Sequence, residues 1–203
     1  MAGTRDRILA ATNELFRRYG YNGTSLKQVT LTADVPTGSV YHFFPGGKDE
    51  LARTVIETSG EVYRQLFEVI ADAAADPVAA IADFFEGAAI VLEQTDFIDP
   101  CPIGTVAREV ASANDELRRA TSRVFVSWVD AAAGHFEAAG IPRRDSHELA
   151  ITTVAALEGG FVLARAARDA EPLRAAGRNI RRLVMAAMTQ GAADPGDGVT
   201  ARR

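Results

Sequence analysis

The sequence has little cysteine and little lysine, and it lacks long hydrophobic runs. Its 203 residues include one cysteine, Cys101, which excludes an internal disulfide framework and is typical of a reducing compartment. The first residues carry charges where an export signal would need an apolar core, and we find no run of about 18 apolar residues for a membrane-spanning helix. We therefore expect a soluble, cytoplasmic protein that has no membrane partner.

The alternation of polar and apolar positions that is typical of a half-buried strand is nearly absent too. Apolar residues recur instead at helical spacing, and 47% hydrophobic residues are enough for a core. The pattern predicts an all-α fold of about nine helices. Three short helices are expected up to and including Phe44, the first capped by Thr4 and the second by Thr24 or Ser25. Longer helices are expected over residues 48–74, from 77, from about 105, and over 114–139, 146–168 and 171–190.

Signals for catalysis are missing as well. The three histidines, His42, His135 and His147, lack the spacing of metal ligands, and Cys101 has no evident histidine partner. No phosphate-binding loop or dinucleotide fingerprint is present. We expect no metal, no cofactor and no enzymatic activity, and we keep a helical-bundle enzyme as a minor alternative.

Charge is distributed unevenly along the chain. The net charge is -5, yet residues 1–50 hold six basic and five acidic residues, and both lysines lie there. In this segment two short helices meet at a tight corner, Asp34-Val35-Pro36, where aspartate tolerates the left-handed backbone that a sharp turn needs. Such a pair is typical of a helix-turn-helix unit, in which the second helix enters the major groove of DNA.

The second helix of this unit begins near Thr37 and has two distinct faces. Val40 and Phe44 are spaced four apart and face inward, whereas hydroxyl, phenol and imidazole groups that can contact phosphates and base edges face outward. The helix has no Arg, Asn or Gln, so we expect binding to depend on phosphate contacts, on thymine methyl groups and on duplication of the site by dimerisation. The candidate DNA-contacting residues are Thr24, Ser25, Lys27, Gln28, Thr37, Gly38, Ser39, Tyr41, His42 and Lys48.

Residues 4–51 resemble the DNA-binding domain of the TetR family of bacterial regulators through YGYNGTSLKQVT, ADVPTGSVYHFF and KDEL. The remaining chain is similar to a branch associated with multidrug-efflux genes, through CPIGTVARE, ALEGGFVLARAARDAEPLR and FPGGK. The resemblance implies a repressor that binds a palindromic operator as a homodimer and is released by a small hydrophobic or aromatic effector. This chain departs from the family pattern at Asp34, Thr37 and Phe43, and Phe43 cannot make the phosphate hydrogen bond of a histidine or tyrosine.

The chain divides into three expected segments. Residues 1–47 form the DNA-binding domain, residues 48–191 form the ligand-binding and dimerisation domain, and residues 192–203, rich in Gly, Pro and Asp, form a disordered tail. The last two helices carry apolar stripes that suit either a four-helix interface across a twofold axis or the core of one subunit. The candidate interface residues are Ile151, Val154, Ala155, Gly159, Val162, Ile180, Leu183, Val184, Ala187 and Met188.

The middle helices hold more bulky apolar residues than a DNA tether needs. Each one is either a core residue or part of an apolar ligand cavity, and the resemblance implies a cavity. Glu158 is either a polar anchor in that cavity or a member of a salt bridge. The candidate pocket residues are Phe67, Phe84, Phe85, Phe97, Cys101, Ile103, Phe125, Trp128 and Glu158.

Two other kinds of regulator remain as alternatives. In one, Cys101 is a redox sensor, although no positive charge precedes it to lower its pKa. In the other, the chain is an architectural DNA-binding protein without a ligand.

Overall fold

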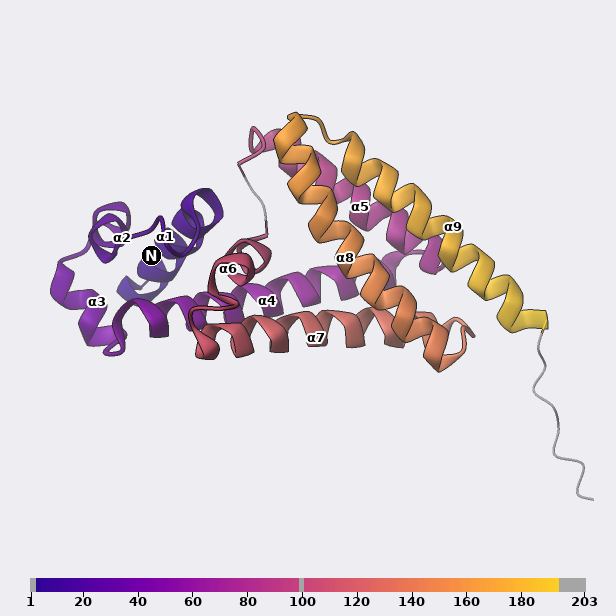
Figure 1. Ribbon diagram of the computed structural model, residues 1–203, viewed down its shortest axis with the longest axis horizontal. Helices are drawn as coiled ribbons and strands as arrows, with labels where there is room; N and C mark the ends of the chain where they lie inside the picture. Colours follow the sequence, from indigo (N-terminus) through magenta and orange to yellow (C-terminus); the bar gives the residue numbers. More distant parts are fainter. Residues whose placement is uncertain (1–2, 99–100, 194–203) are drawn as a thin grey trace, which may run out of the picture.

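The computed structural model describes residues 3–98 and 101–193, and these residues form nine α-helices and no strand, which confirms the predicted all-α fold (Figure 1). The residues 194–203 of the expected tail lie outside the described part of the chain. The helices are α1 (Thr4–Tyr19), α2 (Leu26–Ala33), α3 (Thr37–Phe43), α4 (Gly47–Ala73), α5 (Pro77–Gln94), α6 (Pro102–Val110), α7 (Asp115–Ala138), α8 (Arg143–Ala167) and α9 (Glu171–Ala193).

Most helix ends follow from the capping residues that the sequence offers. Ser25, Asp76 and Asn114 each accept a hydrogen bond from a backbone N–H of the first turn that follows. Asp34 closes α2 in the left-handed conformation, with φ at 51°. Thr4 is not a cap, contrary to our prediction, because α1 already begins at this residue.

Two helices begin three residues earlier than expected. The first is α6, which starts at Pro102 rather than near Thr105, because proline fits the first helical position and the sulfur of Cys101 accepts a 3.4 Å hydrogen bond from the N–H of Gly104. The second is α8, which starts at Arg143, directly after Pro142. Both predictions placed a proline outside a helix that in fact begins at or directly after it.

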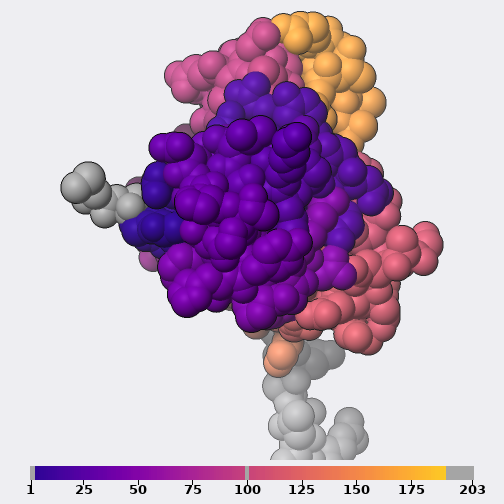
Figure 2. All heavy atoms as spheres, turned by 90° about the vertical axis from the view of Figure 1, so that its left-hand side faces the viewer, coloured from indigo at the N-terminus to yellow at the C-terminus, as the bar shows by residue number. Residues whose placement is uncertain are grey.

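The first three helices form a compact head that has its own core. Ile8 and Leu15 of α1 pack with Val40 of α3 and with Phe44, and Leu51 in the first turns of α4 completes the cluster. Figure 2 looks onto this end of the molecule, where the indigo-to-purple N-terminal part of the chain covers the surface that faces the viewer. The head therefore projects from the body and leaves α3 at its outer side.

The remaining helices form the body. The helix α4 runs from the head along α7, and α8 and α9 lie side by side with α5 packed against α9 (Figure 1). Two apolar clusters fill the body: one lies near the head between α1, α4, α6 and α7, and the other lies at the far end between α4, α5, α7, α8 and α9. The short helix α6 lies between the head and the body and contacts both α1 and α7.

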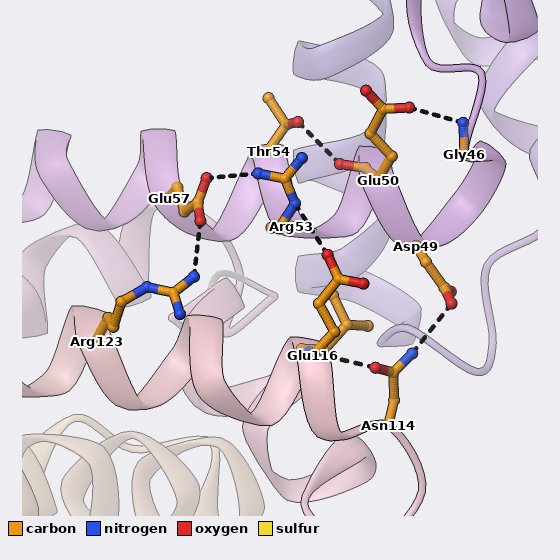
Figure 3. Close-up of polar contacts among 10 residues, drawn as sticks. Gly46, Asp49, Glu50, Arg53, Thr54, Glu57, Asn114, Glu116 and Arg123 are labelled. Carbon is orange, nitrogen blue, oxygen red and sulfur yellow. Dashed lines mark hydrogen bonds and ion pairs between the residues drawn. The ribbon is translucent and has the colours of Figure 1, made fainter.

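Polar contacts fix the first turns of α4 against the start of α7 (Figure 3). Arg53 of α4 pairs with Glu116 of α7 at 3.2 Å and with Glu57 one turn along its own helix at 3.3 Å. Arg123 of α7 pairs with the other oxygen of Glu57 at 3.0 Å. These groups are all partly exposed, so each pair stabilises little by itself, and their main effect is to set the register of the two helices.

The helix α8 is apolar on more than one face. It has 25 residues, a mean hydropathy of 1.4 in its most apolar window, and 28% of that window is buried, so by length and composition it could cross a membrane. The helix nevertheless contains no run of about 18 apolar residues, because Thr152, Thr153 and Glu158 interrupt it. One face packs on α7 and α9, and the opposite face leaves Ile151, Val162 and Leu163 exposed.

The close approach of α4 and α7 requires glycine at position 60. A Cβ atom there would lie 2.5 Å from a methyl group of Val124, and the Gly60 carbonyl accepts a 2.8 Å hydrogen bond from the indole of Trp128. We expect Gly60→Ala to lower the free energy of unfolding by about 1–3 kcal/mol through overpacking. Gly134→Ala, at a position on α7 with open space around it, should raise it by about 0.5–1 kcal/mol. Equal unfolding midpoints in urea for the two variants would contradict this packing argument.

Candidate functional site

The helix α3 presents a polar face to solvent and an apolar face to the head. Val40 is fully buried, and Phe44, directly after the helix, is 1% exposed, whereas Tyr41 is 53% exposed. Thr37, Gly38 and His42 are exposed as well, and Ser39 is half-buried. The inward and outward faces are those that the spacing predicts. This face therefore brings the predicted groups together on one side of the molecule.

The helix α2 offers fewer groups to DNA than we expected. Ser25 and Gln28 form a reciprocal capping box: the Ser25 hydroxyl accepts from the Gln28 N–H at 3.2 Å, and the Gln28 side-chain oxygen accepts from the Ser25 N–H at 2.8 Å. Lys27 is exposed. Thr24 is 2% exposed and its hydroxyl donates to the Gly20 carbonyl at 2.8 Å, so the prediction that it contacts DNA was wrong.

Lys48 lies at the start of α4, partly covered by its neighbours. Its Nζ is 4.2 Å from the centre of the Tyr21 ring, and burial lowers the pKa of Lys48 more than the carboxylates of Asp49 and Glu109 raise it. The Gly46 N–H at the same helix end already donates to Glu50 at 2.7 Å (Figure 3). To bind a DNA phosphate, Lys48 would therefore have to leave the Tyr21 ring. That Lys48 contacts a phosphate stays a prediction.

A cluster of polar groups that the sequence did not reveal joins the head to the body. The Tyr21 hydroxyl donates to the Asp49 carboxylate, and burial together with this bond raises the pKa of Tyr21. Asn114 at the start of α7 donates to the same carboxylate at 3.1 Å (Figure 3). Glu109 of α6 accepts a 2.6 Å hydrogen bond from the backbone N–H of Asn22. No local pattern marks these residues, because the partners are 28 to 87 positions apart.

The body holds an apolar cavity of about 280 Å³. Five of the nine predicted pocket residues line it, and these are Phe67, Phe84, Cys101, Trp128 and Glu158. Its walls come from α4, α5, α7 and α8, with Cys101 at the start of α6. The other lining residues are Tyr63, Arg64, Leu66, Ile70, Gly87, Ala88, Val91, Ala131, Ala132, Thr153, Val154, Leu157 and Phe161.

Four predicted pocket residues lie elsewhere. Phe85 is 1% exposed and packs where Gly177 of α9 leaves room. Ile103 is fully buried in the cluster next to the head. Phe97 lies beneath the Arg168 guanidinium, 5.5 Å from it, and Phe125 lines a separate groove between α6, α7 and α8. The sequence analysis also missed Tyr63, Leu157 and Phe161, although the last two are four residues apart on α8 and flank Glu158.

Glu158 is the acidic residue of the cavity wall, and its carboxyl group is largely buried. One carboxylate oxygen lies against the Cα of Gly104, where any side chain would collide with it, and the other, Oε1, is buried without a hydrogen-bond partner. Burial raises the pKa of Glu158, and this effect exceeds the opposing effects of a hydrogen bond with Cys101 and of the Arg108 charge. Burial therefore shifts the carboxyl group toward its neutral form.

Cys101 is buried beside Glu158. Burial raises the pKa of its thiol strongly, and the neighbouring carboxyl group raises it further. Reactive thiols are exposed and have a lowered pKa, because the thiolate is the reacting species. The environment of Cys101 therefore disfavours the redox-sensor alternative.

The predicted interface residues on α8 and α9 divide into three groups. Ile151, Ala155, Gly159, Val162 and Leu183 are exposed. Ile180 is 2% exposed and Val184 is fully buried in the subunit core, so their prediction as interface residues was wrong. Val154 lines the cavity, and Ala187 and Met188 pack against the core as partly buried residues.

A three-helix head with an outward helix, mounted on a helical body with an apolar cavity, defines a helix-turn-helix transcriptional regulator. Residues 8–55 match the model of bacterial regulatory proteins of the tetR family, and residues 77–179 match that of the C-terminal domain of LmrA/YxaF-like transcriptional regulators. The chain belongs to the TetR family. The prediction of a DNA-binding regulator rather than an enzyme is thereby confirmed.

Individual relatives agree with this membership. The chain is 33% identical over 170 residues to the HTH-type transcriptional regulator YxaF of Bacillus subtilis, covering 84% of this chain and 89% of that protein. A TetR regulator from Legionella pneumophila has the same fold, with a TM-score of 0.81 at 23% identity over 90% of this chain and 97% of that one. The fold also matches a cysteine mutant of the TetR regulator CifR complexed with 26-base-pair operator DNA, with a TM-score of 0.76, 21% identity, and 90% and 97% coverage.

The outward position of Tyr41 gives a test of the DNA-binding face. Tyr41→Ala and Tyr41→Phe should each raise the Kd for operator DNA about tenfold or more, because a hydrogen bond to a charged group contributes about 1.5–3 kcal/mol. Thr152→Ala, which removes an exposed hydroxyl from α8, serves as the control and should leave the Kd unchanged. Fluorescence anisotropy over a salt series measures the effect, and wild-type affinity for both Tyr41 variants would disprove the assignment of α3.

Proposed function

We propose that this regulator is a homodimeric, cytoplasmic repressor that binds a palindromic operator and is released by a small apolar effector. In this proposal residues 1–47 form the DNA-binding domain and residues 48–191 form the ligand-binding and dimerisation domain. The observation that carries it is the aromatic-lined cavity in the body, from which α4 and α6 both lead to the head.

The composition of α3 supports a dimer. The helix has no Arg, Asn or Gln, so one head lacks the bidentate base contacts that each contribute about 1–3 kcal/mol of discrimination. Two heads about one turn of DNA apart, or somewhat more, double the number of contacts. A symmetric pair of heads requires a palindromic operator.

The exposed apolar face of α8 and α9 supports the place of the dimer contact. Val162, Leu163 and Leu183 are 46%, 62% and 47% exposed, and Gly159 between them has open space around its Cα. Large apolar side chains that gather on one face are typical of a surface covered by a partner. A second copy that applies the same face would bury α8 on both sides, which accounts for its high hydropathy.

Two helices support a coupling between the cavity and the head. Tyr63 and Phe67 of α4 line the cavity, and Leu51 of the same helix belongs to the core of the head. Cys101 lies at the cavity end of α6, and Glu109 near its other end holds the N–H of Asn22. A ligand that shifts either helix favours a different spacing of the two heads, and it must weaken DNA binding by the same coupling free energy.

Selection of bound duplexes from a random pool, followed by release with apolar compounds, tests this function. We expect a palindromic operator, and we expect an effector to release it and to quench the single tryptophan, Trp128. Gly87→Leu should abolish release without weakening operator binding, because the new side chain enters the cavity at a position with no neighbour within 4 Å. Gly134→Leu, also in open space but outside the cavity, is the matched control. Release that is unchanged in Gly87→Leu would reject this cavity as the effector site.

The proposed dimer contact has its own test. Leu163→Glu places a charge on the shared face and should weaken dimerisation by at least about 2 kcal/mol, or about 30-fold in Kd, because a buried unpaired charge is costly. Val69→Glu alters an equally exposed apolar residue, 66% exposed on α4, and should leave the dimer intact. Sedimentation equilibrium measures both variants, and a wild-type dimer constant for Leu163→Glu would place the interface elsewhere.

A further inference from the structure

We infer that the effector is an apolar molecule carrying one protonated amine, and that Glu158 binds this amine inside the cavity. The inference rests on the ligand-responsive function proposed above and names the chemical class of its ligand. It is carried by the position of the carboxyl group, by its missing hydrogen-bond partner and by the aromatic rings around it.

The carboxyl group of Glu158 is held so that one oxygen remains available. On the side of α6, Gly104 leaves room for the carboxylate, and the Cys101 thiol forms a hydrogen bond with it. The sulfur of Cys101 in turn accepts from the Gly104 N–H at 3.4 Å. The remaining oxygen, Oε1, is buried without a hydrogen-bond partner, in a residue that lines the cavity. A buried acceptor without a donor is costly, so a ligand that supplies the donor gains this free energy on binding.

The charged groups around the cavity are compatible with a positively charged ligand. Tyr63 from α4 and Cys101 at the start of α6 face Glu158, and neither carries a positive charge in any protonation state. Arg108 of α6 acts on the carboxyl group, but less than burial does. Arg64 at the cavity wall is bound by both Glu61 and Glu68 of its own helix. A cationic ligand would therefore stabilise the ionised form of Glu158, which burial disfavours.

The aromatic rings favour a cation over a neutral hydroxyl group. Tyr63 and Trp128 meet edge to face with centroids 6.1 Å apart, and Phe67 and Phe84 do so at 5.4 Å. Phe161 completes the aromatic lining. Ring faces attract ammonium groups, by about 2 kcal/mol or more where water is excluded. An alcohol would use the acceptor of Glu158, whereas an ammonium group uses both the acceptor and the ring faces.

Binding of an amine must also change the protonation of Glu158. Burial raises the pKa of Glu158, which favours the neutral carboxyl group, and a cation at hydrogen-bond distance lowers that pKa again. The titratable and charged groups that face it, Tyr63, Cys101 and Arg108, belong to α4 and α6. At a pH between these two pKa values, amine binding should therefore release a proton, and the neutral isosteres should release none.

Three probes with one shared ring test the inference: 4-phenylbutylamine, 4-phenylbutan-1-ol and pentylbenzene. The readouts are Trp128 fluorescence, excited beyond the phenyl absorption, and titration calorimetry in buffers of different ionisation enthalpy, on the full-length protein without DNA. The amine should bind about tenfold or more tightly than the alcohol at pH 7.5, with pentylbenzene weakest. Glu158→Gln should remove this preference and any proton release, while leaving the affinity for pentylbenzene unchanged. Glu148→Gln, which alters an exposed glutamate of the same helix, should leave all three affinities unchanged.

The ranking on the wild-type protein decides the inference even if Glu158→Gln does not fold. Alcohol binding as tight as amine binding overturns it, and so does an amine preference that persists in a folded Glu158→Gln variant. Failure of all three probes to bind, while other apolar compounds release the operator, overturns this inference and leaves the proposed function standing. Failure to bind any operator would reject the proposed function without changing the ranking of the probes.

Discussion

The continuity of α4 is the constraint on which the rest of the structure depends. At about 1.5 Å per residue its 27 residues span about 40 Å, and its buried side chains enter all three apolar clusters in turn. Leu51 belongs to the head, Val55 and Ile56 to the cluster beside it, and Phe67 to the far cluster that borders the cavity. Because a packed helix of this length moves as one body, the head cannot reorient without a change along the cavity wall.

The short helix α6 adds a second connection, and glycine permits it at both ends. At its start, Gly104 leaves the space that a carboxylate oxygen of Glu158 occupies. Near its end, Glu109 lies against Gly20, whose φ of +73° and missing side chain allow the turn after α1 to approach this carboxylate. The first turn of the nine-residue helix α6 therefore contacts the carboxyl group of Glu158, and Glu109 in its last turn contacts the head. Because α6 contacts both regions, a displacement at one end of this helix would affect the other end.

Helical periodicity could predict the faces of the helices, but not which neighbour covers each face. Periodicity correctly predicted that Val40 and Phe44 face inward and that Tyr41 faces outward, because α3 packs on one side only, against the rest of the head. It could not separate Phe84 from Phe85, since adjacent residues on α5 face the cavity and α9 respectively. The apolar residues of α9 divide in the same way: Val184 enters the core, and Leu183 beside it remains exposed. The contacts of Glu109 and Asn114 join distant segments and leave no periodic signal at all.

The two apolar faces of α8 place the proposed ligand and the proposed partner on opposite sides of one helix. Glu158 and Gly159 are adjacent, yet the first lines the cavity and the second faces solvent. Leu157 and Phe161 continue the cavity side, and Val162 continues the outer side. In the proposed dimer each cavity is therefore separated from the twofold interface by a single helix. A ligand that displaces α8 would change the dimer contact and the cavity end of α6 together, so both heads would respond to either subunit's ligand.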